Sequence, residues 1–254
     1  MRMLDLFSGI GGFALAAEWV WGDELDITGF CEIEKYAQKV LQKNFPGVPI
    51  HDDITKLNGK DFKNIDLITG GFPCQDISIA NQNNPKGIEG KRSGLWSEMW
   101  RIISEIRPRF ALIENVPILT IRGGTRVIAD LAEIGYDAEW QSISAKQVGA
   151  WHKRERIWIA AYPSCDRMER PAVHAKTNKK GIETTPEKWF ELQFQNHGNN
   201  KIEFRKKDKS FLCGDNDGIP FRLDFDRRNR LKGLGNAIVP QVAALIMERI
   251  KDAE

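Results

Sequence analysis

The first twenty-one residues, MRMLDLFSGIGGFALAAEWVW (1–21), decide the expected fold. Residues 2–6 are mostly apolar and predict a short buried strand, and the spacing of apolar residues over 10–21 predicts a helix. The glycine-rich turn 7–12 joins them. Such a turn lets a ligand approach the backbone and the free N–H groups of a helix start. A dinucleotide-binding turn has the pattern G-x-G-x-x-G, but Ala14 stands where its third glycine would be.

The alternation of strand and helix continues outward from this unit. Helices are expected over 33–45, 94–107 and 126–133, and further strands over 25–32, 48–51, 65–69, 109–114, 136–144 and 156–162. Alternating elements of this kind predict an α/β domain in which a mainly parallel sheet lies between two layers of helices.

A second kind of sequence follows Pro163. Residues 165–210 hold eleven Lys and Arg against seven Asp and Glu, and their apolar periodicity fades. Helical periodicity returns over 236–251. We therefore expect three parts: an α/β domain over 1–162, a small lobe over 163–230, and a C-terminal helix over 231–254 that returns to the first domain.

Length and composition exclude several classes of protein. A chain of 254 residues with 41% hydrophobic residues can bury a core, so a disordered chain is excluded. The net charge of +2 does not by itself indicate a polyanionic partner. The four cysteines form no C-x-x-C pair, which argues against a zinc site and a disulfide framework. No apolar run approaches membrane-spanning length, so a cytoplasmic protein is expected.

Two carboxylates follow predicted strands near the glycine turn. Glu32 ends the second strand, a position that commonly binds ribose hydroxyls, although it could equally be a solvated carboxylate at a helix start. Asp53 follows the strand 48–51 and could accept a hydrogen bond from an adenine amino group, or simply cap a turn ahead of Thr55. Together with the turn, they predict a pocket for an adenosine-containing cofactor.

Three further groups suggest chemistry. Cys74 lies in the glycine-rich loop GGFPCQ (70–75); a lone cysteine is usually inert, but one beside a cofactor site can be a nucleophile. Glu114 follows an apolar strand into the same crevice, or is a loop carboxylate neutralised by a neighbour. Arg154 and Arg156 would share one face of a strand, and the apolar residues that follow favour a functional position over a solvated charge run.

Seven motifs occur here in an order that resembles the DNA cytosine-5 methyltransferases. They are DLFSGIGGF (5–13), CEIEKYA (31–37), DDI (52–54), GGFPCQDIS (70–78), ENV (114–116), HKRERIWI (152–159) and GLGNAIVPQVA (233–243). The resemblance covers the chain apart from about 163–225. It departs from the usual pattern at His152, where Gln is common, at Ala237, where Ser is common, and in the shortness of the 163–230 segment.

The resemblance implies a role for each matching residue. Cys74 would attack C6 of cytosine, Glu114 would hydrogen-bond N3 and the exocyclic amine, and Arg156, supported by Arg154, would hold O2. Gln75 and Ser78 would contact DNA. The expected contacts to S-adenosylmethionine are Phe7, Gly9, Gly11, Gly12, Glu32, Asp53, Ile54, Pro73 and Asn236.

The resemblance also implies the fold, the cofactor and the partner of the protein. It predicts a three-layer, Rossmann-like methyltransferase sheet that uses S-adenosylmethionine and no metal, with a small target-recognition lobe and double-stranded DNA as partner. In the lobe, the basic residues Arg205, Lys206 and Lys207 are expected to meet phosphates, unless they form a solvated loop. A monomer is expected, and a cognate restriction endonuclease is an open question.

Three alternative functions compete with DNA methylation. A tRNA cytosine-5 methyltransferase shares these motifs. A nicotinamide-dependent oxidoreductase would want the third glycine and would not need a Pro-Cys-Gln loop. A non-catalytic DNA-binding relative would not need Cys74, Glu114 and Arg156 intact.

Overall fold

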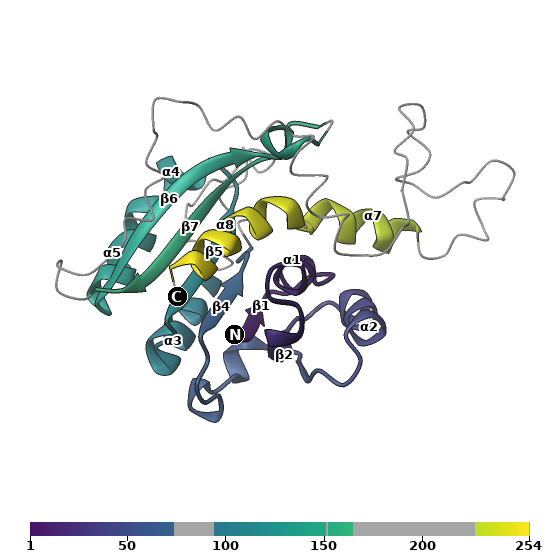
Figure 1. Ribbon diagram of the computed structural model, residues 1–254, viewed down its shortest axis with the longest axis horizontal. Helices are drawn as coiled ribbons and strands as arrows, with labels where there is room; N and C mark the ends of the chain where they lie inside the picture. Colours follow the sequence, from purple (N-terminus) through teal and green to yellow (C-terminus); the bar gives the residue numbers. More distant parts are fainter. Residues whose placement is uncertain (74–93, 151, 165–226, 254) are drawn as a thin grey trace, which may run out of the picture. The chain divides into compact units, whose positions relative to one another are not determined.

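The computed structural model describes residues 1–73, 94–150, 152–164 and 227–253 (Figure 1). The chain divides into two compact units, one formed by Met1–Ala175 with Ile238–Glu254 and the other by Lys176–Ala237. Helix α7 (Arg227–Asn236) belongs to the second unit, and the other described elements belong to the first. No described helix is long and apolar enough to cross a bilayer.

A seven-stranded sheet forms the centre of the first unit, in the order β3-β2-β1-β4-β5-β7-β6. Its strands are β1 (Arg2–Leu6), β2 (Asp26–Cys31), β3 (Ile50–His51), β4 (Leu67–Gly70), β5 (Phe110–Asn115), β6 (Tyr136–Ser144) and β7 (Glu155–Pro163). β1 to β5 pair in parallel, whereas β7 runs antiparallel to both β5 and β6. The predicted α/β class and mainly parallel sheet are confirmed.

Helices cover both faces of this sheet. On one face, α3 (Leu95–Ile106) and α5 (Gly124–Glu133) bury their apolar sides in the main core. On the other face, α1 (Gly12–Trp21) and α2 (Lys35–Asn44) share a smaller apolar cluster with Phe30. The last helix, α8 (Pro240–Asp252), packs against α1, and Lys251 Nζ donates to the carbonyl of Val20 at 2.9 Å. Figure 1 shows this pairing of the first and last helices.

Most differences from the expected elements have local causes. α1 begins at Gly12 rather than at residue 10, because Gly11 holds a left-handed conformation with φ 88°. α8 begins at Pro240 rather than at residue 236, because the residue before a proline avoids the helical conformation, and Val239 is extended. The short helix α4 (Leu119–Arg122) and the helix α7 were not expected.

Three short 3-10 turns complete the described connections used below. They are η2 (Ile54–Lys56), η3 (Gly59–Asp61) and η6 (Ala145–Val148). η6 lies in the connection from β6 to β7, whose described residues (145–150 and 152–154) form no crossover α-helix. A parallel pair needs a crossover of a dozen or more residues, so this short connection gives an antiparallel pair.

Candidate active site

The glycine turn after β1 has the conformation that a close ligand approach requires. Gly9 has φ 54°, which favours glycine, and a Cβ atom built there would meet no atom within 4 Å. At Gly11, by contrast, a Cβ atom would lie 2.6 Å from Cε2 of Phe45, and at Gly12 it would lie 2.6 Å from Cγ1 of Ile238. Gly11 and Gly12 therefore serve packing, while Gly9 leaves open space beside its backbone. Phe7 also has a positive φ, 54°.

Glu32 supports this turn from the end of β2. Its carboxylate is buried and accepts hydrogen bonds from the backbone N–H of Gly9 and of Glu34, both at 2.7 Å. The next residue, Ile33, is 70% exposed. The Glu32 carboxylate therefore holds the backbone of the turn, and the residue that follows Glu32 presents an apolar side chain to solvent. Ile33 was not among the expected site residues; its signal was an apolar residue directly after a strand-ending acid.

Asp53 caps the turn η2, which was one of its two expected roles. Its Oδ1 accepts from the backbone N–H of Thr55 at 3.0 Å and from the Thr55 hydroxyl at 2.7 Å, while Lys56 Nζ lies 3.4 Å from Oδ2. The hydrogen bonds from Thr55 lower the pKa of Asp53. Ile54, which follows, is buried in the main core. The carboxylate is therefore fixed in place and ionised at neutral pH.

A largely buried ion pair joins the carboxyl end of β5 to the start of β7. Arg156 Nε lies 2.9 Å from Glu114 Oε1, and these side chains are 22% and 12% exposed. Burial raises the pKa of Glu114 to about 7, although the charges of Arg156 and Arg154 act to lower it. Burial and the charge of Arg156 lower the pKa of Arg154. Glu114 is therefore a carboxyl that can change protonation near neutral pH.

Arg154 lies just before β7 rather than in it, and its φ is 25°. The expected strand alternation with Arg156 therefore does not apply to it. The negative charge of Glu114 nevertheless acts to raise the pKa of Arg154, against the lowering by burial and by Arg156.

Sheet register places this pair on the face of the glycine turn. Glu114 lies opposite Trp158 in the antiparallel pair of β5 and β7, so both side chains point to one face. The ring of Trp158 packs edge-on against Phe13 of α1, with centroids 5.9 Å apart. The turn that starts α1 and the Glu114–Arg156 pair thus share one face at the carboxyl end of the central strands, where α/β sheets bind ligands.

The chain that leaves β4 is fixed against Glu114. A Cβ atom on Gly71 would lie 3.1 Å from Oε2 of Glu114, so glycine allows this close approach. The next residue, Phe72, is held twice: its carbonyl accepts from Nδ2 of Asn115 at 3.1 Å, and its ring lies 5.3 Å from that of Trp96. Asn115 is another residue that sequence reasoning missed, although it stands inside the E-N-V motif.

Several expected site residues cannot be placed in this geometry. Pro73 is the last described residue of this loop, and Cys74, Gln75, Ser78, Arg205, Lys206 and Lys207 lie outside the described residues. Asn236 ends α7 in the second unit, so its contact with the cofactor stays a prediction. Within the described ranges, no three potential metal-binding side chains gather in one place.

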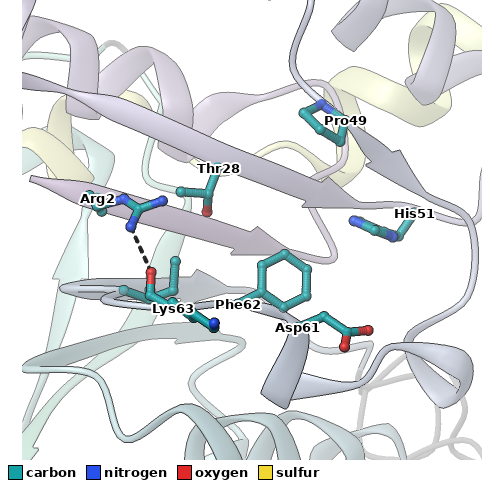
Figure 2. A pocket seen from close by; sticks show the side chains of 8 residues that line it. Arg2, Thr28, Pro49, His51, Asp61, Phe62 and Lys63 are labelled. Atoms are coloured by element: carbon teal, nitrogen blue, oxygen red, sulfur yellow. Dashed lines mark hydrogen bonds between the residues drawn. The ribbon is translucent and has the colours of Figure 1, made fainter.

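A cavity of about 300 Å³ lies away from these residues. Figure 2 shows Arg2, Thr28, His51 and Phe62 among the side chains around it, and Arg2 Nη1 donates to the carbonyl of Lys63 at 2.7 Å. Arg2 also pairs with Asp26 at 3.0 Å. The cavity shares no residue with the site described above, and its arginine is already paired.

Comparison with known proteins identifies the family of this chain. The family model of the C-5 cytosine-specific DNA methylases matches residues 1–212. The chain belongs to this family. As a member, it has the α/β methyltransferase fold, and its family implies the use of S-adenosylmethionine.

Its relatives are type II methyltransferases. The chain is 38% identical to M2.BsuMI of Bacillus subtilis over 169 residues, which are 63% of this chain and 42% of that protein. It is 34% identical to M.HhaI of Haemophilus parahaemolyticus, covering 64% and 49%, and 30% identical to M.NlaX of Neisseria lactamica, covering 84% and 70%. The chain thus spans less than half the length of the first two.

A solved structure shows the same fold. The crystal structure of Dnmt2 methyltransferase from S. pombe matches 65% of this chain and 52% of its own, with a TM-score of 0.55 and 26% identity.

Proposed function

We propose that this protein transfers a methyl group from S-adenosylmethionine to C5 of a cytosine in duplex DNA. The observation that carries the proposal is the buried Glu114–Arg156 pair, which lies on the face of the glycine turn and against Gly71, three residues before Cys74. The names of the type II relatives and of the C-5 cytosine-specific family support the same activity.

The proposed nucleophile answers a chemical need. C5 of cytosine is a poor nucleophile, and addition of the Cys74 thiolate at C6 moves the ring's π electrons so that C5 becomes enamine-like. When bound, S-adenosylmethionine supplies the electrophilic methyl group. Loss of the C5 proton to a base and cleavage of the C6–S bond then restore the aromatic ring and the free cysteine.

Glu114 and Arg156 suit the charge that develops on the ring. Addition at C6 places negative charge on N3 and O2, so N3 needs a proton donor and O2 needs a cation. Burial raises the pKa of Glu114 to about 7, so a large fraction of this carboxyl can carry the proton near neutral pH. We assign N3 to Glu114 and O2 to Arg156, with Arg154 in support. Because these edges are covered in a duplex, the cytosine must be flipped out of the stack.

The residues around the glycine turn fit an adenosine-containing sulfonium cofactor. Gly9 borders open space, Glu32 lies beneath it, and the exposed Ile33 offers an apolar surface for a flat ring. Asp53 is held as an ionised acceptor. The geometry supports Gly9, Glu32 and Asp53 as direct contacts, whereas Gly11, Gly12 and Ile54 would shape the pocket through their packing. Phe7, Pro73 and Asn236 complete the proposed cofactor set.

Glu32→Ala and Asp53→Ala should each weaken binding of S-adenosylmethionine by about 1–3 kcal/mol, the size of a lost hydrogen bond to a charged group. Calorimetry on the free protein measures this. Asp26→Ala is the matched control. Asp26 is an exposed carboxylate at the opposite end of β2 from Glu32. Unchanged cofactor affinity combined with lost DNA affinity would reassign both carboxylates to DNA.

We further propose that 163–230 recognises the target, while 1–162 and 231–254 form the catalytic domain. The packing of α8 on α1 supports the return of the C-terminal helix. The lobe's basic cluster, together with Gln75 and Ser78, would face DNA. The sequence supports this through Lys201, Arg205, Lys206, Lys207 and Lys209, which stand against only Glu203 and Asp208.

Replacing Arg205, Lys206 and Lys207 together by Ala should weaken binding to all duplexes. Phosphate contacts release counterions, so the slope of log affinity against log salt should flatten by up to about 3. Fluorescence anisotropy over a salt series measures it. The control replaces Lys35, Lys39 and Lys43, three exposed lysines of α2, and changes the charge equally. A triple variant with the wild-type slope would remove this cluster from the DNA interface.

The proposed activity has a direct test. Bisulfite or nanopore sequencing of DNA from cells that express the protein should find 5-methylcytosine within one short recurring sequence. Purified protein should transfer a radiolabelled methyl group to duplex DNA and not to tRNA. Labelling of tRNA alone would instead establish the tRNA methyltransferase, and cofactor binding without any transfer would establish the non-catalytic relative.

A further inference from the structure

Arg101 connects α3 to the segment that follows Asp53. Its Nη2 donates to the carbonyl of Ile54 and its Nη1 to the carbonyl of Leu57, both at 2.9 Å. The other N–H groups of Arg101 donate to two carboxylates of its own helix, Glu98 and Glu105. Nε lies 2.9 Å from Glu98, and Nη1 lies 3.0 Å from Glu105. One guanidinium thus holds two backbone carbonyls while its charge is compensated on both sides.

Glu105 extends the same attachment by one more residue. Its Oε2 accepts from the backbone N–H of Gly59 at 2.7 Å, and a Cβ atom on Gly59 would lie 2.7 Å from Cβ of Glu105. The backbone therefore touches the helix here. Between them, Arg101 and Glu105 fix the start of η2, its end and the start of η3 to α3.

The attachment is one that arginine alone provides. The side chains of Ile54 and Leu57 are both buried in the main core, so the orientation of their carbonyls is coupled to core packing. A guanidinium presents five N–H groups in a fixed plane and can serve two carbonyls and two carboxylates together. A lysine ammonium has three donors at one point and cannot reproduce that geometry.

We propose that Arg101 is a positioning residue for the cofactor: it holds Asp53 and Ile54 in the arrangement that binds the adenosine part of S-adenosylmethionine. The inference rests on the proposed assignment of these two residues to the cofactor. Arg101 contacts the backbone of this segment rather than the Asp53 carboxylate, which Thr55 holds, and none of the seven motifs quoted above contains Arg101.

The test measures the dissociation constant of S-adenosylmethionine by calorimetry on the free full-length protein. Arg101→Lys and Arg101→Met should each raise it about tenfold or more, since each loses charge-assisted hydrogen bonds. The KM for S-adenosylmethionine should rise in parallel, while kcat at saturating cofactor stays within about twofold. The control is Arg107→Lys, because Arg107 directly follows α3 and contacts Tyr136 rather than 54–59.

Hydrogen exchange separates positioning from general loss of stability. The amides of 54–59 should exchange faster in Arg101→Lys, while those of β5 keep the wild-type rate. If Arg101→Met does not melt cooperatively, Arg101→Lys carries the test. Wild-type affinity in both variants, or a fall in kcat with an unchanged KM, would overturn the inference while leaving the proposed function intact. A wild-type protein that binds no S-adenosylmethionine would overturn both.

Discussion

Cys74→Ala should lower methyl transfer to duplex DNA by at least about 10⁴-fold, because C5 is activated in the proposed mechanism only by addition of the Cys74 thiolate at C6. Binding of S-adenosylmethionine should persist, since the Cys74 side chain is not among the proposed cofactor contacts. The strongest measurement uses DNA carrying 5-fluorocytosine at the target. Fluorine at C5 blocks the final elimination, so the wild-type protein should form a complex that survives denaturation, and Cys74→Ala should form none.

Cys31→Ala is the matched control for this experiment. Cys31 ends β2 and is buried, and burial together with nearby carboxylates raises the pKa of its thiol to about 12. It is therefore a protonated thiol at neutral pH, and its replacement should leave trapping intact. Covalent capture of the fluorinated DNA by Cys74→Ala would show that another nucleophile performs the addition.

Glu114→Gln should have the next largest effect, a loss of roughly 10²–10⁴-fold in the single-turnover rate, which is the usual contribution of a positioned acid. Glutamine keeps the shape and one hydrogen bond but cannot transfer a proton. Glu155→Gln is the control, because Glu155 stands near the same edge of the sheet but forms an exposed pair with Lys153 at 3.0 Å.

The pH dependence carries a sign that follows from the burial of Glu114. Its protonated form is the active one in the proposed mechanism, and its pKa is raised to about 7. The protonated fraction is complete well below pH 7 and falls as the pH rises through that value. The single-turnover rate should therefore decrease as the pH rises through about 7. In Glu114→Gln this decrease should be absent. A decrease that survives unchanged in Glu114→Gln belongs to another group.

The elements of this fold were largely predictable because they depend on local pattern. The strands β1 and β6 have the expected bounds: β1 is mostly apolar, and β6 begins directly after Gly135. The direction of β7 depends on the length of the connection after β6 rather than on the strand's own residues, and the sequence analysis did not use that length. The start of α1 depends on the left-handed backbone conformation of Gly11. Glycine permits this conformation but does not require it, so the sequence alone does not predict it.

In the candidate site, too, some residues could be predicted from local sequence and others could not. Glu32, Asp53, Glu114 and Arg156 could be named from the sequence because each lies at or near the end of a strand. The partners that hold them could not, because they join residues far apart in the chain: Glu32 meets the N–H of Gly9 across 23 positions and Asn115 meets the carbonyl of Phe72 across 43. Only a folded backbone shows which carbonyl or N–H each polar side chain reaches.

The pairing of α1 with α8 constrains when this protein can finish folding. Val20 and Lys251 are 231 residues apart in sequence, yet a hydrogen bond joins them, and Ile238 fills the space above Gly12. During synthesis, α1 therefore leaves the ribosome long before the helix that covers it. Contacts of such large separation slow folding and prolong the exposure of apolar surface. The face of α1 that α8 covers should consequently stay uncovered until α8 has emerged from the ribosome.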